Sequence, residues 1–267
     1  LEQDYPQERL RVLVVDNGSE DRTPEVAREL GAVVRTYRRP GVAGARQYGW
    51  KAARSELIAY LDADCEPPRD WLKRLVKQMK ANTKIGAIGV KLISPPPRTL
   101  AERHIIETGI LDTDQFWTRN SLQWPFLVTA GMILRREALE AVGGFDLSLG
   151  RATGEDADLC WRLTDAGWLV RYDPSVEVIH HHRSTVPAML RQVHWYGYSS
   201  AALFAKWRGE LGWWRYTDWG PYRRIARGFA KAPFALAARD RYERFRPLLE
   251  IIDGTAFLLG KWRGEMR

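Results

Sequence analysis

Two carboxylates, Asp62 and Asp64, directly follow a short apolar segment over residues 57–61, and Pro67 and Pro68 come just after them. The apolar segment has the length of a buried strand, and the prolines prevent it from continuing regularly. In an open α/β sheet, ligands bind beyond the carboxyl ends of the strands, where these aspartates lie. Carboxylate oxygens suit hard divalent cations such as Mg²⁺ and Mn²⁺. Taken alone, such a pair is more often an acidic turn after a strand, and the motifs along the rest of the chain are what favour a metal or ligand site.

Three consecutive histidines, His180 to His182, end another apolar segment over residues 176–179 and supply further candidate metal ligands. In an extended chain, His180 and His182 share one face, while His181 lies on the opposite face. Alternation therefore groups His180 with His182 as candidates on one face. The alternative interpretation is a polar strand end without a metal.

A second acidic pair, Glu155 and Asp156, precedes a helix predicted over residues 159–166. An acid at this position can cap the helix, because the first N–H groups of a helix carry partial positive charge. Sequence position alone leaves a capping role and a chemical role open. Asp158 is expected to serve structure, and Arg162, one turn later, to pair with an acidic neighbour or a phosphate.

The elements that must position these residues alternate between strands and helices, which predicts an α/β fold with a mostly parallel sheet flanked by helices. The clearest helix start is Thr23 followed by Pro24, a capping residue and a proline at the first helical position. Strands are predicted over 10–15, 32–37, 57–61, 85–93, 126–134, 168–172 and 176–179, and helices over 24–30, 45–54, 71–80, 135–142 and 159–166. Residues 99–125 have no clear pattern.

Composition describes a folded protein with an anionic partner. The chain has 267 residues, a net charge of +8 and 45% hydrophobic residues. Such a charge suits a nucleotide, a phospholipid surface or a nucleic acid, and does not choose among them. Cys65 and Cys160 are too few for a disulfide framework, so a reducing, cytoplasmic location is expected. No signal peptide is expected, and no stretch approaches the length of a transmembrane helix.

Six motifs taken in order resemble family 2 glycosyltransferases with the GT-A fold, a Rossmann-like α/β architecture. The resemblance spans roughly residues 10–185, and the ordered set is far more specific than any one motif. The motifs are Val14-Val15-Asp16-Asn17-Gly18-Ser19, Ala45-Arg46-Gln47-Tyr48-Gly49, Leu61-Asp62-Ala63-Asp64, Arg135-Arg136-Glu137 through Gly143-Gly144-Phe145-Asp146, Gly154-Glu155-Asp156-Ala157-Asp158-Leu159, and the histidine triplet.

The resemblance implies a site for a nucleotide-sugar donor, with a UDP-, GDP- or TDP-linked sugar. Asp16 would contact the base or ribose, and Arg46 would lie near the same nucleotide. Asp62 and Asp64 would hold the ribose and a Mg²⁺ or Mn²⁺ ion that bridges the diphosphate, while Arg183 would neutralise phosphate charge.

The resemblance also implies that Asp156 is the general base that deprotonates an acceptor hydroxyl in an inverting transfer. Inversion in one displacement needs this base on one face of the sugar and the diphosphate on the other. The metal ligands would be Asp64, Asp62, His180 and His182.

Two departures from the family pattern bear on the function. The strand with which the family usually begins is missing before Leu10, so the donor pocket is expected to be N-terminally incomplete. The Gln-x-x-Arg-Trp motif of processive members is also missing, and Arg191-Gln192-Val193-His194-Trp195 echoes it only loosely. A single sugar transfer is therefore expected, to a glycan or a lipid-linked acceptor such as a cell-surface polysaccharide precursor.

A change of character near residue 187 predicts two parts, a catalytic domain over 1–187 and a basic helical extension over 188–267. The extension is rich in tryptophan, with Trp195, Trp207, Trp213, Trp214 and Trp219 close together. Basic helices with aromatic faces are typical of in-plane binding to an anionic membrane. Packing on the catalytic domain or on a second subunit is the alternative.

Two other functions remain open from the sequence. A nucleotidyltransferase would share the sheet architecture, but its usual glycine-rich basic loop near the N-terminus is not found. A non-catalytic basic protein that binds membrane or nucleic acid fits the charge, yet no nucleic-acid-binding motif is present, and no nucleic-acid partner is expected.

Overall fold

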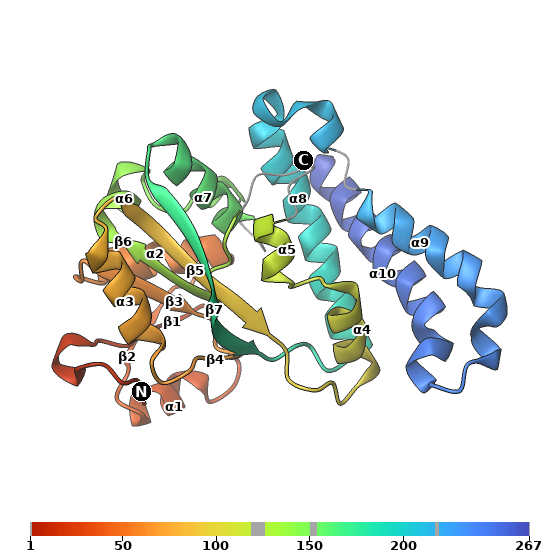
Figure 1. Ribbon diagram of the computed structural model, residues 1–267, viewed down its shortest axis with the longest axis horizontal. Helices are drawn as coiled ribbons and strands as arrows, with labels where there is room; N and C mark the ends of the chain where they lie inside the picture. Colours follow the sequence, from red (N-terminus) through yellow and green to blue (C-terminus); the bar gives the residue numbers. More distant parts are fainter. Residues whose placement is uncertain (1, 119–125, 150–153, 217–218, 267) are drawn as a thin grey trace.

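A computed structural model of the chain shows an α/β body joined to a layer of long helices (Figure 1). The structure describes residues 2–118, 126–149, 154–216 and 219–266, and for 118 and 210–216 it describes the backbone only. The strands are β1 (Leu13–Asp16), β2 (Val33–Thr36), β3 (Leu57–Leu61), β4 (Cys65–Glu66), β5 (Ile85–Ile93), β6 (Gly131–Arg135) and β7 (Leu169–His180).

The helices lie between and after these strands. They are α1 (Thr23–Glu29), α2 (Val42–Ala52), α3 (Trp71–Ala81), α4 (Leu100–Thr108), α5 (Thr113–Thr118), α6 (Arg136–Ala141), α7 (Glu155–Asp165), α8 (Val186–Tyr216), α9 (Gly220–Lys231) and α10 (Arg241–Glu265). Short 3₁₀ turns are η1 (Gln7–Arg9), η2 (Leu147–Leu149) and η3 (Ala232–Ala237). Among the described residues, no helix has the length and apolar character needed to cross a bilayer.

The sheet is mixed, so the prediction of a mostly parallel sheet is wrong. β1 and β2 pair in parallel as a separate two-stranded sheet, while the main sheet has the order β3-β6-β5-β7-β4. Within it only β5 and β7 are parallel, and β6 runs antiparallel to both β3 and β5. In the residues described, which begin at Glu2, no strand precedes β1.

Because β5 and β6 are antiparallel, the chain between them leaves and re-enters the sheet at the same end. That connection contains α4 and α5, where the sequence had no clear pattern, and it does not return to the far end of the sheet. Gly131, the first residue of β6, instead pairs with Leu61, the last residue of β3.

Two hydrophobic clusters cover the two faces of the sheet, as alternation of side chains along a strand requires. Ile88 and Ile133 point to α3 and pack with Leu75 and Met79. Their neighbours along the strands, including Met132, point to the other face. That face packs against α6 and α7, with Leu139, Leu159, Trp161 and Leu163 at its centre.

Helix α8 belongs partly to this second cluster. Leu203, Phe204 and Trp207 of α8 are buried in the cluster that contains Trp161 of α7. Asp158 accepts a hydrogen bond from the indole nitrogen of Trp207 at 3.0 Å, which fixes the helix to the body. The sequence places its boundary near 187, at the start of α8, and that division stays a prediction.

Helices α9 and α10 form the outermost layer, side by side and beyond α8 (Figure 1). Small residues allow this close packing: a Cβ added at Gly260 of α10 would collide with the His194 carbonyl of α8. Gly197 of α8 is equally tight against the Phe257 carbonyl. The glycines therefore set the distance between α8 and α10.

Candidate active site

Asp64 and His180 meet because β4 pairs with the last residues of β7. Cys65 is the register partner of His180 in this antiparallel pair, and the Asp64 carbonyl accepts a hydrogen bond from the His181 N–H at 2.9 Å. The Asp64 Oδ1 and the His180 Nε2 lie 3.6 Å apart. Two motifs separated by more than 100 residues are thus brought to the same end of the sheet.

The group formed by Asp64, Cys65 and His180 offers three ligand atoms within 4.8 Å of one another. The Nδ1 of His180 is buried without a hydrogen-bond partner. An octahedral cation places neighbouring ligand atoms about 3 Å apart, so the Asp64–His180 pair is close to that requirement. Burial, with the charges of Asp62 and Asp64, raises the pKa of the Cys65 thiol to about 12. The carboxylate and the imidazole are therefore the fitting donors for a hard cation, and the protonated thiol is not.

The three histidines have different surroundings, as the alternation along the strand predicts. His180 is buried, and burial lowers its pKa. His181 points away and contacts the Glu66 carboxylate at 2.6 Å. His182 lies beside His180, with ring centroids 5.2 Å apart, and its Nε2 is 2.6 Å from the Ser94 hydroxyl. Burial lowers the pKa of His182 to about 4, which keeps both rings neutral and able to ligate.

Asp62, the first carboxylate of the pair, is held by Arg46 of α2. The Arg46 guanidinium contacts Asp62 at 3.0 Å and also forms a close ion pair with Glu155 at the start of α7. Burial alone would lower the pKa of Arg46, but the carboxylates of Glu155, Asp62 and Asp156 raise it. Arg46 therefore joins two predicted motifs. Its contact with a nucleotide, and a metal contact of Asp62, stay predictions.

Asp156 is half-buried in the first turn of α7, where its carboxylate accepts a hydrogen bond from the Ala157 N–H at 2.9 Å. Burial and the neighbouring Glu155 raise the pKa of Asp156 to about 7. A carboxylate with a pKa near the working pH can take up a proton from a hydroxyl group, as a general base must. The environment of Asp156 is therefore chemically suited to that role.

Two further predicted residues are Asp16 and Arg183. Asp16 ends β1, and hydrogen bonds from Ser19 lower its pKa and keep it ionised. Arg183 is mostly exposed, with its guanidinium 3.7 Å from the Asp64 carboxylate. Both positions leave these side chains accessible to a ligand, and their binding roles stay predictions.

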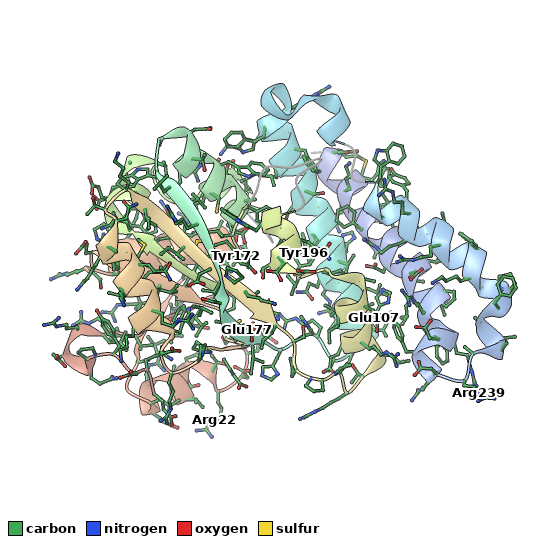
Figure 2. The ribbon with its side chains drawn as sticks, in the orientation of Figure 1. Arg22, Glu107, Tyr172, Glu177, Tyr196 and Arg239 are labelled. Carbon is green, nitrogen blue, oxygen red and sulfur yellow. The ribbon has the colours of Figure 1, made fainter. Side chains whose placement is uncertain are left out.

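The sequence assigned no specific role to three residues around the site, Glu155, Ser94 and Tyr196. Glu155 is fully buried against Arg46, and its position beside Asp156 was the only signal for it. Ser94 contacts His182 from a proline-rich loop that carried no signal. The hydroxyl of Tyr196 in α8 (Figure 2) accepts a hydrogen bond from the Gln192 side-chain amide at 2.7 Å. Burial raises the pKa of Tyr196, and the carboxylates of Asp156 and Asp62 add to this effect. Helix α8 also packs beside the start of α7, where a Cβ added at Gly154 would contact Leu203.

Comparison with known proteins defines the class to which this fold and site belong. The family model described as glycosyl transferase family 2 matches residues 1–143, more than half of the chain. The chain therefore belongs to glycosyl transferase family 2, as its motifs predicted.

Curated relatives agree with this assignment. The chain is 33% identical over 211 residues to the pre-mycofactocin glycosyltransferase of Mycobacterium tuberculosis, covering 73% of this chain and 42% of that protein. It is 31% identical over 186 residues to glycosyltransferase AglE of Haloferax volcanii, covering 67% and 59%. The chain thus spans about half the length of these relatives.

Solved structures confirm the fold. The mannosyltransferase PcManGT from Pyrobaculum calidifontis, solved in complex with GDP-Man and Mn²⁺, matches with a TM-score of 0.62 and 20% identity. The match covers 99% of this chain and 80% of that one. GalNAc-T7, solved with UDP, GalNAc and Mn²⁺, matches with a TM-score of 0.51 and 16% identity, covering 82% and 48%. The GT-A-like architecture with C-terminal helices is therefore confirmed.

Proposed function

We propose that this protein is a metal-dependent, inverting glycosyltransferase that moves one sugar from a nucleotide-sugar donor to an acceptor hydroxyl. The observation that carries the proposal is the division of the site into two carboxylate groups with different environments. Asp64 lies beside the neutral His180, as a cation ligand should. Asp156 has a pKa raised to about 7, as a general base should. Two relatives by fold were solved with Mn²⁺ and a nucleotide or nucleotide-sugar, which supports the same chemistry here.

In this proposal Asp64 and His180 hold a Mg²⁺ or Mn²⁺ ion, with Asp62 and His182 as further candidate ligands. The ion would supply positive charge that stabilises the leaving nucleoside diphosphate without proton transfer. Arg183 is placed beside Asp64 to add charge-assisted hydrogen bonds to phosphate oxygens. Asp16 contacts the nucleoside part of a UDP-, GDP- or TDP-linked sugar.

Asp156 accepts the proton of the acceptor hydroxyl as that oxygen attacks the anomeric carbon of the donor. The bond from that carbon to the diphosphate breaks on the opposite face, so the configuration inverts. Arg46 holds Glu155, the residue next to the base, and so fixes the start of α7. Asp156 lies in this first turn of α7 and is held in place with it.

The acceptor belongs to the same proposal: a glycan or a lipid-linked hydroxyl compound, such as a cell-envelope polysaccharide precursor, at an anionic membrane on its cytoplasmic face. A nucleotidyltransferase is the competing enzyme class. Its chemistry releases pyrophosphate from a nucleoside triphosphate, whereas the proposed reaction releases a nucleoside diphosphate. Phosphorus NMR of the products separates the two.

The proposal is tested by thermal shift with UDP, GDP, TDP and their sugars, with and without Mn²⁺, on the wild type, Asp64→Ala and Asp156→Asn. A ligand present at 100 times its Kd stabilises the folded state by about 2.7 kcal/mol, which such a measurement resolves. We expect metal-dependent stabilisation by one nucleotide, lost in Asp64→Ala and kept in Asp156→Asn. An absence of any nucleotide effect in the wild type contradicts the proposal.

A further inference from the structure

The outermost helices carry large apolar side chains on their exposed surface. On the α9–η3–α10 hairpin these include Tyr222, Phe229, Phe234, Leu236, Leu248 and Trp262, and we call this set the hairpin face. Leu236 is 86% exposed and Phe234 is 75% exposed, so neither contributes to the core. Trp207, which the sequence placed in the same aromatic region, is instead buried against α7. The hairpin face is therefore a distinct feature of α9, η3 and α10.

The exposed apolar residues of α10 form a single stripe. Phe245, Leu248, Leu259 and Trp262 fall on a pattern of alternating three- and four-residue spacings, which keeps them on one side of a helix. On α9, Tyr222 and Phe229 are seven residues apart and likewise share one side. Each helix thus has one apolar stripe that faces away from the core.

Both stripes lie on the same side of the hairpin. The helices pack through Gly228 of α9 against the Pro247 carbonyl, and through Gly254 of α10 against Ile225. At 3.6 residues per turn, the apolar stripe of each helix lies about a third of a turn round the helix axis from the side that contacts the other helix. Viewed from the N-terminus of each helix, the direction of this rotation is the same. Because the two helices are antiparallel, equal rotations turn the stripes to the same side. The result is one broad apolar surface two helices wide.

The charge around this surface is strongly positive. Between Gly220 and Arg267, eleven Lys and Arg stand against five Asp and Glu, and α9 and η3 contain no acid at all. Two of the five acids are buried in ion pairs: Glu250 with Arg227 and Arg246, and Asp253 with Arg224. Basic side chains that remain exposed include Arg223, Lys231, Arg239 and Arg241. Arg239 lies at the turn between η3 and α10 (Figure 2).

We propose that the hairpin face is a membrane-binding surface, which lies in the plane of a bilayer with anionic phospholipid headgroups. Apolar residues enter the boundary between headgroups and acyl chains, while the surrounding Arg and Lys contact lipid phosphate. A second copy of this chain fits less well, because face-to-face pairing would bring two basic rims together. Binding at this surface depends on neither the metal nor the nucleotide, so its failure and the failure of the proposed transfer reaction are separate results.

The test is vesicle co-sedimentation of the whole chain with phosphatidylcholine alone and with phosphatidylcholine containing 30 mol% phosphatidylglycerol, a composition chosen for the assay at about 0.1 M salt. The apolar variant is Phe229→Ser/Phe234→Ser/Leu236→Ser, and the charge variant is Lys231→Glu/Arg239→Glu/Arg241→Glu. These residues are exposed, so both variants should fold. Each Lys or Arg near an anionic membrane strengthens binding through its attraction to lipid phosphate. The loss of three such residues should therefore weaken vesicle binding by more than about tenfold.

Control variants place the same kinds of change at two positions each on the α/β body. Leu30→Ser/Leu147→Ser removes two exposed apolar side chains from the α/β body, and Arg9→Glu/Arg11→Glu reverses two exposed charges there. We expect the wild type and both controls to bind anionic vesicles, with weaker binding at high salt, and both hairpin variants to lose it.

Three results would overturn the proposal. One is no binding of the wild type to anionic vesicles, and another is undiminished binding of the apolar variant. The third is a wild-type dimer that does not bind vesicles and that the apolar variant converts to a monomer. That last result would assign the hairpin face to a second copy of the chain.

Discussion

The Oδ1 of Asp64 and the Nε2 of His180 lie 3.6 Å apart at the point where β4 pairs with β7. The Arg183 guanidinium lies 3.7 Å from the same carboxylate and is more than half exposed, so it can turn toward solvent or a phosphate when a cation binds. The pair is therefore open to a cation, and it links the acidic motif after β3 to the histidines at the end of β7.

Replacing His180 by Asn should weaken Mn²⁺ binding strongly. Even residues that only orient metal ligands usually change affinity by about 10- to 100-fold, and loss of a direct ligand should exceed this. Isothermal titration with Mn²⁺ measures the effect. His181→Asn is the matched control, because His181 faces away toward Glu66. Equal losses in both variants would contradict the assignment of His180 as the ligand.

The rate of sugar transfer should rise with pH through about 7. Asp156 acts as a base only when ionised, and burial together with Glu155 raises its pKa to about 7. Activity is therefore low at pH 5.5 and reaches a plateau above about pH 8. Glu155→Gln removes the neighbouring negative charge and should move the midpoint to lower pH. A midpoint unchanged by Glu155→Gln would argue against Asp156 as the titrating group.

The same raised pKa predicts that Asp156 costs stability once it ionises. Its ordinary pKa of 3.8 applies to the unfolded chain, so folding disfavours the ionised form as pH rises from about 4 to 7. Asp156→Asn should therefore raise Tm more at pH 8 than at pH 4, while abolishing transfer. Differential scanning calorimetry without metal or donor tests this. A gain in Tm that is the same at both pH values would contradict it.

Arg46→Ala should destabilise the chain by about 3–5 kcal/mol, the usual cost of leaving one partner of a buried ion pair alone. The partner is Glu155, which is 1% exposed. Combining Arg46→Ala with Glu155→Gln should recover part of the loss, since the uncompensated charge is gone. Urea unfolding of the wild type, the two single variants and the double variant measures the coupling. Strict additivity would show that the pair does not interact in solution.

Asp158→Ala should weaken the attachment of α8 to the body and cost about 3–5 kcal/mol. The Asp158 carboxylate is fully buried. It accepts hydrogen bonds from Arg162 at 2.8 Å and from the Trp207 indole at 3.0 Å. Asp165→Ala, at the exposed end of the same helix, is the control and should change stability little. Urea unfolding compares the two variants, and equal effects would show that Asp158 does not anchor α8.

Local patterns in the sequence determined much of this protein. Runs of apolar residues with polar turns located β1, β2, β3 and β5 to within a few residues, because backbone preference and side-chain alternation act over short distances. The ordered motifs led to the family, which the family match confirmed. Alternation along a strand was also enough to separate His181 from His180, because neighbouring side chains of a strand point to opposite faces.

Tertiary structure alone decided how those pieces meet. Strand direction is set by where the connection between β5 and β6 emerges, and the unpatterned residues of α4 and α5 carried no signal for it. Arg46 on α2 reaches Glu155 on α7 because packing brings two distant segments together, which no spacing in the sequence records. Likewise, whether Trp207 or Trp262 is buried depends on which side of its helix faces a neighbouring helix. Trp207 of α8 is buried and donates a hydrogen bond to Asp158, whereas Trp262 of α10 is exposed.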